Sequence, residues 1–295
     1  MSKVRVALDW TPNTIHLPLI IARDRGFYKE VGLDVELTDP SQDNYSKTPA
    51  RKLVEGSVDL AVCPSESVIA FTSSHKKIQA VATLLAKDAS VIASLPSYKR
   101  PRDLSGRRYA SYGARYEDAI INHVIHRDGG SSPATVVQPP KLEIWKALQA
   151  EEVDFTWIFL PWEGVQARRA NVQLSTFHLK DYDVPYGYSP VLARDPAGAL
   201  SDDVLTKFMI ATRRGFQLLR DSREEAVDIM CHHCSEDREM IRESLSCIEE
   251  YCVEEDGSYG TMKEEKWRDF IDFLKGRRLV EELTVEELFT NRFVQ

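Results

Sequence analysis

Residues 53–66 read Leu53-Val54-Glu55-Gly56-Ser57-Val58-Asp59-Leu60-Ala61-Val62-Cys63-Pro64-Ser65-Glu66. This order predicts a helix that ends at a glycine, a buried strand that begins at Val-Asp, and a Pro-x-Glu turn that starts another helix. A similar order returns at Leu148–Trp157, followed by Pro161-Trp162-Glu163. Two such segments predict two lobes of like topology, with a ligand held in the cleft between them. The alternative is a chance repetition of a common α/β turn.

Strand and helix patterns alternate on both sides of these segments. The expected strands are Val4–Leu8, Leu33–Leu37, Val58–Cys63, Ile78–Leu85, Arg108–Ser111, Thr135–Gln138 and Val153–Phe159. The expected helices are His16–Val31, Thr48–Glu55, Ser65–Ser73, Asp118–His126 and Lys141–Ala150, with a charged helical region from about Ser201. This alternation predicts an α/β fold of mainly parallel sheets with helices on both faces. We expect residues 1–88 and 189–295 in lobe one, and residues 89–188 in lobe two.

Composition narrows the class of protein. The 295 residues are 43% hydrophobic and 28% charged, as in an ordinary globular protein. The net charge of −8 argues against a nucleic-acid partner, and the short basic run Lys99–Arg102 is too small to indicate a membrane surface. Met1-Ser2-Lys3 leads into a short apolar run without a cleavage site, so we expect a cytoplasmic protein. The odd number of cysteines, five, agrees with a reducing compartment.

The first expected strand is followed by three residues whose side chains could bind a ligand. Trp10 offers a flat face for stacking, Asn13 offers a donor and an acceptor, and His16 can act as either. The carboxyl end of a strand is where open α/β sheets bind ligands. The alternative is that Trp10 belongs to the core and His16 lies beside a helix cap.

Further candidates lie at other strand ends. Ser65 resembles an N-cap, and Glu66 either complements the helix dipole or accepts N–H groups of a ligand. In lobe two, the loop Tyr112–Glu117 joins a strand end to a helix start. It contains Gly113 and Arg115, which suit an anion there, although one glycine makes no phosphate loop. The remaining candidate ligand-binding residues are aromatic or acidic and lie near strand ends or in the crossing between lobes: Tyr112, Tyr116, Trp162, Glu163, Tyr186 and Tyr188.

Cys231-His232-His233-Cys234 has a spacing that resembles a metal site. Structural zinc sites place their ligands on knuckle-like turns, whereas this run lies in a charged helical region. We therefore expect free thiols, no metal site and no catalytic residue that the sequence can name.

Three phrases carry a family resemblance: Leu8-Asp9-Trp10-Thr11-Pro12-Asn13-x-x-His16, Gly26-Phe27-Tyr28-Lys29-Glu30-x-Gly32-Leu33-Asp34-Val35 and Gly56–Ala61. The chain resembles the fungal thiamine-pyrimidine (hydroxymethylpyrimidine phosphate) synthases and the related bacterial formylaminopyrimidine-binding proteins, over about Val4 to Arg213. The second phrase is shared by many solute-binding proteins, and the first points to the pyrimidine branch. The resemblance implies a two-lobed type II periplasmic-binding-protein fold that binds a pyrimidine or pyridoxal phosphate.

The chain departs from the synthases at their reactive positions. The resemblance implies that those enzymes hold pyridoxal phosphate on a lysine, draw atoms from a histidine and need iron. Aligned on Val58-Asp59-Leu60, these positions are Cys63 and Ser67, and a Schiff base needs an amine that Cys63 lacks. The synthases' cysteine-rich run is also missing around Tyr186–Val191.

We therefore expect a protein of thiamine precursor biosynthesis or salvage that binds a planar heterocycle, either an aminopyrimidine or a pyridoxal phosphate-like molecule. One alternative is an enzyme that forms hydroxymethylpyrimidine phosphate from pyridoxal phosphate with other residues, and only that alternative needs pyridoxal phosphate and iron. A second alternative is the solute-binding component of an uptake system. The sequence leaves homodimerisation open.

Overall fold

The computed structural model describes residues 1–141 and 144–294, which form two compact units. Unit 1 comprises residues 1–88, 187–271 and 280–295, and unit 2 comprises residues 89–186 and 272–279. The boundaries differ from the expected ones in two places, since residues 187–188 pack with unit 1 and residues 272–279 pack with unit 2. Within the described residues, no helix combines the length and apolar character needed to cross a membrane.

Unit 1 contains a five-stranded sheet in the order β2-β1-β3-β10-β4. Its strands are β1 (Ser2–Ala7), β2 (Leu33–Thr38), β3 (Leu60–Cys63), β4 (Gln79–Thr83) and β10 (Val191–Arg194). β1 pairs in parallel with β2 and β3, whereas β10 is antiparallel to both of its neighbours. Every residue of β3 is buried, which explains its continuous apolar sequence.

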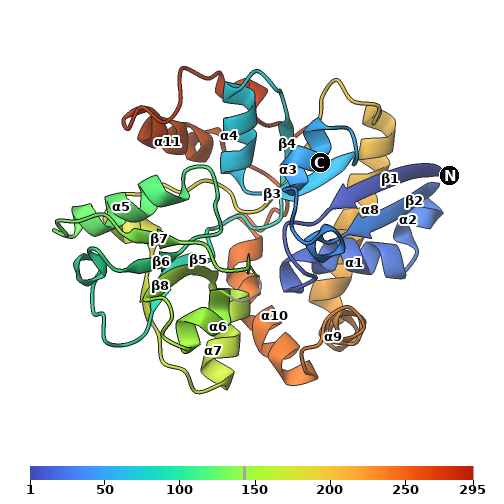
Figure 1. Ribbon diagram of the computed structural model, residues 1–295. Coiled ribbons are helices and arrows are strands. Elements are labelled where there is room, and N and C mark those ends of the chain that lie inside the picture. The colour runs from blue at the N-terminus through green and yellow to red at the C-terminus, as the bar shows by residue number, and fades with distance from the viewer. Residues whose placement is uncertain (142–143, 295) are drawn as a thin grey trace. The chain divides into compact units, whose positions relative to one another are not determined.

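Helices cover both faces of this sheet. They are α1 (Leu17–Asp24), α2 (Phe27–Glu30), α3 (Pro49–Val54), α4 (Ser65–Ser73), α8 (Asp202–Asp221), α9 (Arg223–Cys231), α10 (Arg238–Cys252) and the part of α11 (Glu264–Lys275) up to Ile271. Figure 1 shows α8 passing behind β1 and β2, with α1 below these strands and α3 above β1. The single helix expected over His16–Val31 is wrong, because Gly26 adopts a left-handed conformation (φ +76°) between α1 and α2.

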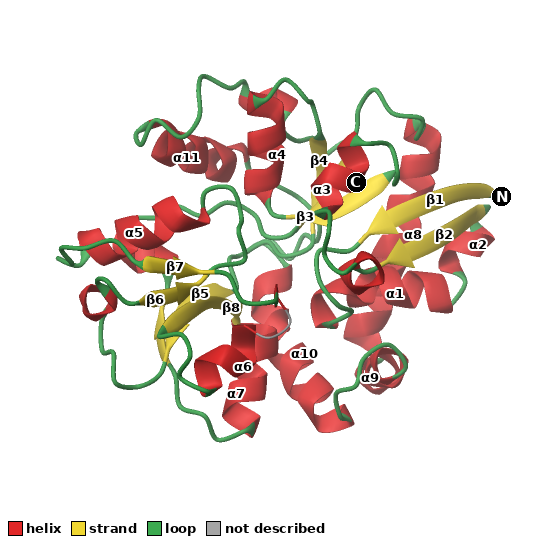
Figure 2. Cartoon of the chain, in the orientation of Figure 1, coloured by secondary structure: helices red, strands yellow, loops and turns green. Residues whose placement is uncertain are grey.

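Unit 2 repeats the arrangement with the order β7-β6-β8-β5-β9. Its strands are β5 (Ser90–Ser94), β6 (Arg108–Ala110), β7 (Thr135–Val137), β8 (Phe155–Phe159) and β9 (Ser175–Phe177). Its helices include α5 (Glu117–Arg127), α6 (Ile144–Gln149) and α7 (Val165–Arg169), and Figure 2 shows α5 on one side of the strands with α6 and α7 on the other. Here β5 is the antiparallel strand, paired with β8 and β9. The α/β fold class is confirmed, with one antiparallel strand in each sheet.

The sequence repetition has a structural cause. β3 and β8 hold the same central place in their sheets, and each begins just after an aspartate that binds an arginine of the neighbouring strand. In unit 1, Arg5 donates to Asp59 from its backbone N–H (2.8 Å) and its guanidinium (2.8 and 3.0 Å). In unit 2, Arg108 donates to Asp154 in the same way, at 2.8, 3.0 and 3.2 Å. Each Val-Asp pair therefore fixes the register of a parallel strand pair at its start.

Candidate functional site

The turn after β1 places a histidine against an aspartate. His16 is fully buried, and its Nε2 lies 2.7 Å from Oδ1 of Asp9, whose side chain is 25% exposed. The Asn13 backbone N–H donates to His16 Nδ1 (3.3 Å), while the Asn13 side chain accepts the Ile15 N–H (2.9 Å). Because Nδ1 accepts, a neutral imidazole carries its proton on Nε2 and donates it to Asp9. Asn13 and His16 therefore form a capping box, and the carboxylate that they support is the partly exposed group.

Trp10 contacts an aromatic ring that the sequence did not identify as a candidate. Its ring centroid lies 5.3 Å from that of Tyr45, with the planes inclined by 58°, and both residues are partly exposed. Tyr45 follows β2, so it reaches the same sheet edge as Trp10. Burial and the charges of Asp39 and Asp9 raise the pKa of Tyr45 to about 12. Its hydroxyl is shielded from solvent and has no hydrogen-bond partner among the described residues.

A second strand end brings a buried carboxylate to this edge. Glu66 lies in the first turn of α4 and is 2% exposed. Burial raises the pKa of the Cys63 thiol far above its usual range, and the charges of Asp9 and Glu66 raise it further. Asp9 follows β1 and Glu66 follows the parallel neighbouring strand β3, so both carboxylates lie at the carboxyl-terminal edge of the same sheet. We call Asp9, Trp10, Tyr45 and Glu66 the strand-end cluster of unit 1.

The crossing at residues 187–188 packs against the start of α4. The Ser65 backbone N–H donates to the Tyr188 carbonyl (2.8 Å). A Cβ on Gly187 would lie 2.4 Å from Ser65 Oγ, so a larger residue there would force the Ser65 side chain to move. The Tyr188 ring is buried, and its hydroxyl accepts the Lys263 N–H (2.6 Å) and contacts Glu254 (3.3 Å). Tyr188 therefore supports the core of unit 1, whereas the Ser65 hydroxyl is buried without a partner among the described residues.

In unit 2, the loop after β6 surrounds one carboxylate. Glu117 is 2% exposed. Its Oε1 accepts the Tyr109 hydroxyl and the Tyr112 N–H (3.0 Å), and its Oε2 accepts the Ser111 hydroxyl (3.0 Å) and the Ala114 N–H (2.9 Å). The Gly113 N–H donates to Ser111 Oγ (3.0 Å). The loop in which the sequence indicated an anion site therefore already contains an anionic side chain.

The other candidates of this loop have different surroundings. Arg115 is exposed, and Tyr116 is buried at the start of α5. Tyr112 is half-buried and packs against the core around Ala110 and Leu148. The ligand-binding roles of these residues stay predictions.

The turn after β8 holds a carboxyl group of raised pKa. Residues 160–164 form a π-helical turn, in which Glu163 Oε2 accepts the Phe159 N–H (3.0 Å). Burial of the carboxyl raises the pKa of Glu163 to about 6, although hydrogen bonds from the backbone lower it. Trp162 in the same turn is buried, and Tyr186 packs on Trp157 of β8 with ring centroids 5.1 Å apart. Aromatic rings and a carboxyl group therefore lie in this part of unit 2 as well.

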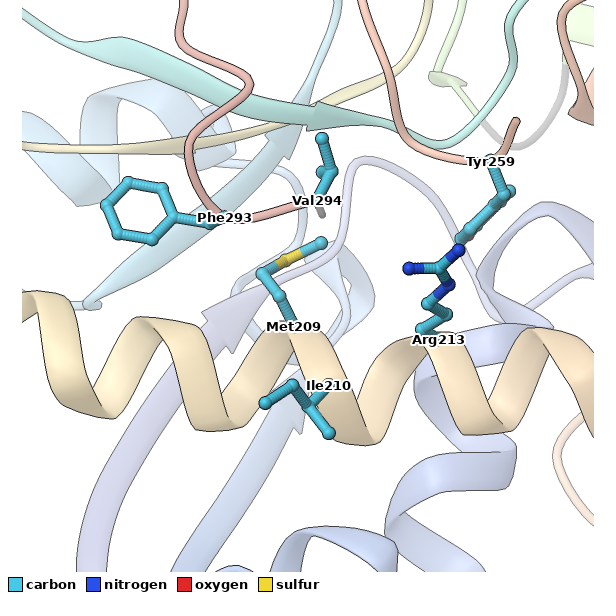
Figure 3. Close-up of a pocket in the computed structure, with 6 residues that line it drawn as sticks. All are labelled: Met209, Ile210, Arg213, Tyr259, Phe293 and Val294. Atoms are coloured by element: carbon cyan, nitrogen blue, oxygen red, sulfur yellow. The ribbon is translucent and has the colours of Figure 1, made fainter.

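A shallow pocket elsewhere in unit 1 contains none of the predicted residues. Figure 3 shows that it lies between α8 and the C-terminal residues, with Met209 pointing toward Val294 and Ile210 pointing away. Its lining side chains are Met209, Ile210, Arg213, Tyr259, Phe293 and Val294. This lining is mostly apolar and lacks the carboxylates of the strand-end cluster.

The cysteines are free thiols in the structure. Cys63 and Cys252 are buried, and Cys231, Cys234 and Cys247 are half-buried. Across residues 1–141 and 144–294, no three His, Cys, Asp or Glu side chains are grouped in a way that could hold a metal ion.

Two like sheets, each with one antiparallel strand and polar groups at its strand ends, define the class of fold, which is the type II periplasmic-binding-protein fold. A conserved Candida albicans gene product described as having the generic periplasmic binding protein fold is similar, with a TM-score of 0.70 and 16% identity, over 100% of this chain and 98% of that one. Residues 13–226 match the NMT1/THI5-like family, and the chain belongs to it.

Two curated relatives are similar over most of the chain. A formylaminopyrimidine-binding protein of Halalkalibacterium halodurans is 23% identical over 97% of this chain and 89% of its own length. A putative thiamine biosynthesis protein of Haemophilus influenzae is 22% identical over 76% of this chain and 71% of its own length. The family resemblance carried by the sequence phrases is thereby confirmed.

Proposed function

We propose that this chain binds an aminopyrimidine of thiamine precursor metabolism, reversibly and without a covalent bond. The strand-end cluster of unit 1 supports this most directly, because it combines two aromatic rings with two carboxylates. An aminopyrimidine has a flat ring that can stack and an exocyclic amine that donates to carboxylates. An anionic solute would instead need N–H groups and arginine. The relatives named for pyrimidine binding and thiamine biosynthesis support the same choice.

In this proposal the ring lies against Trp10 and Tyr45. Asp9, supported by His16, and Glu66 accept N–H groups from the ligand, and the Tyr45 hydroxyl gains the partner that it otherwise lacks. The placement of the ligand between the two lobes, expected from the sequence, stays a prediction. So do the cytoplasmic location, which cell fractionation tests against the uptake alternative, and the oligomeric state.

The residues do not fit the covalent chemistry of the synthase alternative. Cys63 occupies the lysine position, its thiol is buried, and its raised pKa keeps it protonated. A thiol cannot form a Schiff base with pyridoxal phosphate. Incubation with pyridoxal phosphate and borohydride should leave no lysine adduct, and a stoichiometric adduct found by mass spectrometry would favour the enzyme.

The direct test is calorimetric titration with an aminopyrimidine. We expect submicromolar affinity for the wild type and a loss of about 1–3 kcal/mol of binding free energy for Glu66→Gln. Glu30→Gln, which changes an exposed carboxylate of unit 1, is the matched control and should bind as the wild type does. Unchanged affinity of Glu66→Gln together with lower thermal stability would make Glu66 a helix-start residue only. Mass spectrometry of co-purified small molecules gives an independent identification.

A further inference from the structure

Three carboxylates follow three adjacent parallel strands of unit 1. Asp39 follows β2 directly, Asp9 follows β1, and Glu66 lies in the first turn of the helix after β3. Because β1 pairs in parallel with both β2 and β3, all three lie at the carboxyl-terminal edge of the sheet. Burial raises the pKa of Tyr45, and the charges of Asp39 and Asp9 raise it further. Burial and then the charges of Asp9 and Glu66 raise the pKa of Cys63 in the same direction. The potential at this edge is therefore negative.

Two basic side chains near this edge already have acidic partners. The buried His16 ring pairs with Asp9, with 2.7 Å between Nε2 and Oδ1. Lys52 of α3 binds Asp43 in the short helix after β2, with 2.9 Å between Nζ and Oδ2. Each of these bases is matched by an acid, so neither reverses the sign of the potential at the edge.

Aromatic rings and buried hydroxyls complete this edge. The rings of Trp10 and Tyr45 lie 5.3 Å apart between centroids, and both residues are partly exposed. The face of an aromatic ring attracts a cation, as a carboxylate does. The Ser65 hydroxyl after β3 is fully buried, and like the Tyr45 hydroxyl it has no partner among the described residues. Buried polar groups without a partner in the chain indicate a place where another molecule supplies one.

We propose that the strand-end cluster of unit 1 selects its ligand as a cation, so that an aminopyrimidine binds with a protonated ring nitrogen. The inference rests on the proposed function for the identity of the ring and adds its charge state. Protonation by solvent turns a ring nitrogen from an acceptor into a donor, so the ring and its exocyclic amine can each donate to one carboxylate of the cluster. The positive ring also gains a cation–π attraction to Trp10 and Tyr45.

The first test measures the proton. An aminopyrimidine with a ring methyl group is titrated into the wild type about one pH unit above the pKa of the free ligand, in buffers of different ionisation enthalpy. We expect uptake of about 0.9 proton per bound ligand, because the free ligand is then mostly neutral. An analogue with trifluoromethyl in place of the methyl group has a similar shape and a much less basic ring. It should bind at least about tenfold more weakly and take up no proton.

Two results of this titration overturn the proposal. Binding without proton uptake would show that the neutral ring is bound, and equal uptake with both compounds would place the proton on the protein. Glu66→Gln should lower the uptake of the wild type, whereas Glu30→Gln, the exposed control, should leave it unchanged.

The second test needs no pyrimidine, so it separates this inference from the proposed function. N-methylpyridinium and toluene have nearly the same shape and differ by one positive charge, and saturation-transfer NMR measures the binding of each. Asp9→Asn and Glu66→Gln should each lose most of the binding of the cation and keep that of toluene. Absence of any binding of the cation that depends on these carboxylates overturns the proposal. If the cation binds in this way and no aminopyrimidine binds, the proposed function fails and the preference for a cation stands.

Discussion

His16 and Asp9 form a hydrogen-bonded pair at the end of the first strand, with the imidazole Nε2 2.7 Å from the carboxylate. The imidazole is completely enclosed, while a quarter of the Asp9 side chain is exposed. The sequence indicated His16 as a residue that contacts the ligand. Both ring nitrogens of His16 are already used within the turn. We therefore propose that His16 positions Asp9, and a direct contact between His16 and a ligand stays a prediction.

The first prediction concerns this pair. His16→Ala should lower the free energy of unfolding by about 1–3 kcal/mol, because a buried N–H and a carboxylate lose their partner. Aminopyrimidine affinity should fall about tenfold, since Asp9 is no longer held. His16→Gln can still accept the Asn13 N–H in the capping box, so it should recover most of the stability and little of the affinity. Calorimetry and denaturant unfolding measure the two effects, and full affinity in His16→Gln would contradict the positioning role.

The second prediction uses the Tyr45 hydroxyl. Tyr45→Phe removes a shielded group that has no partner among the described residues, so stability should stay equal or rise. Affinity should fall about 3- to 10-fold if the hydroxyl meets the ligand. Tyr28→Phe is the opposite control, because the buried Tyr28 hydroxyl lies 2.8 Å from Thr212 Oγ1. That variant should lose about 1 kcal/mol of stability and keep its affinity, and a Tyr45→Phe protein that binds like the wild type excludes the hydroxyl from the site.

The third prediction concerns pH and Glu163. Its pKa is raised from 4.5 to about 6, so between these values the folded protein holds a proton that the unfolded chain has released. The stability of the wild type relative to Glu163→Gln should therefore decrease as the pH rises from about 4.5 to about 6 and then remain level. Denaturant unfolding of both proteins between pH 4 and pH 7 measures this difference. A difference that does not change with pH would show that burial does not hold the proton on Glu163.

The fourth prediction concerns the two strand-start ion pairs. Burial tends to raise the pKa of Asp59 and of Asp154, but the hydrogen bonds from Arg5 and Arg108 outweigh it and lower both. Asp59→Asn and Asp154→Asn should each cost about 1–3 kcal/mol near pH 7. The difference in stability between the wild type and each variant should disappear as the pH falls through the lowered pKa values, because the wild-type carboxylates then become protonated.

Asp203→Asn is the control for this prediction. It breaks the exposed pair between Asp203 and Lys207 and should change stability by less than about 1 kcal/mol. Because Asp59 and Asp154 lie in different units, the double variant should show the sum of the two losses. If Asp59→Asn and Asp154→Asn lose as little stability as Asp203→Asn, the two aspartates contribute no more than an exposed ion pair does.

The local sequence pattern determined much of the secondary structure of this protein. The repeated Val-Asp and Pro-x-Glu order predicted two like sheets, because strand and helix periodicity and turn residues act over short stretches of chain. The N-terminal phrase correctly predicted a strand that ends before Trp10, and the ligand site at that strand end stays a prediction. The antiparallel strands β5 and β10 were missed, because their direction is fixed by distant partners and not by their own short apolar sequences.

Only the tertiary structure decided which side chains meet at the strand ends. Tyr45 belongs to a polar loop without periodicity, and it reaches Trp10 because β2 lies parallel to β1. The sequence of residues 112–117 suggests an anion loop, and in the folded chain its Tyr112 and Ala114 N–H groups bind the side chain of Glu117. The physical reason is the same in both cases. Sequence spacing gives the chemistry available at a strand end, while burial and hydrogen bonding in the folded chain decide which of those groups remain available to a ligand.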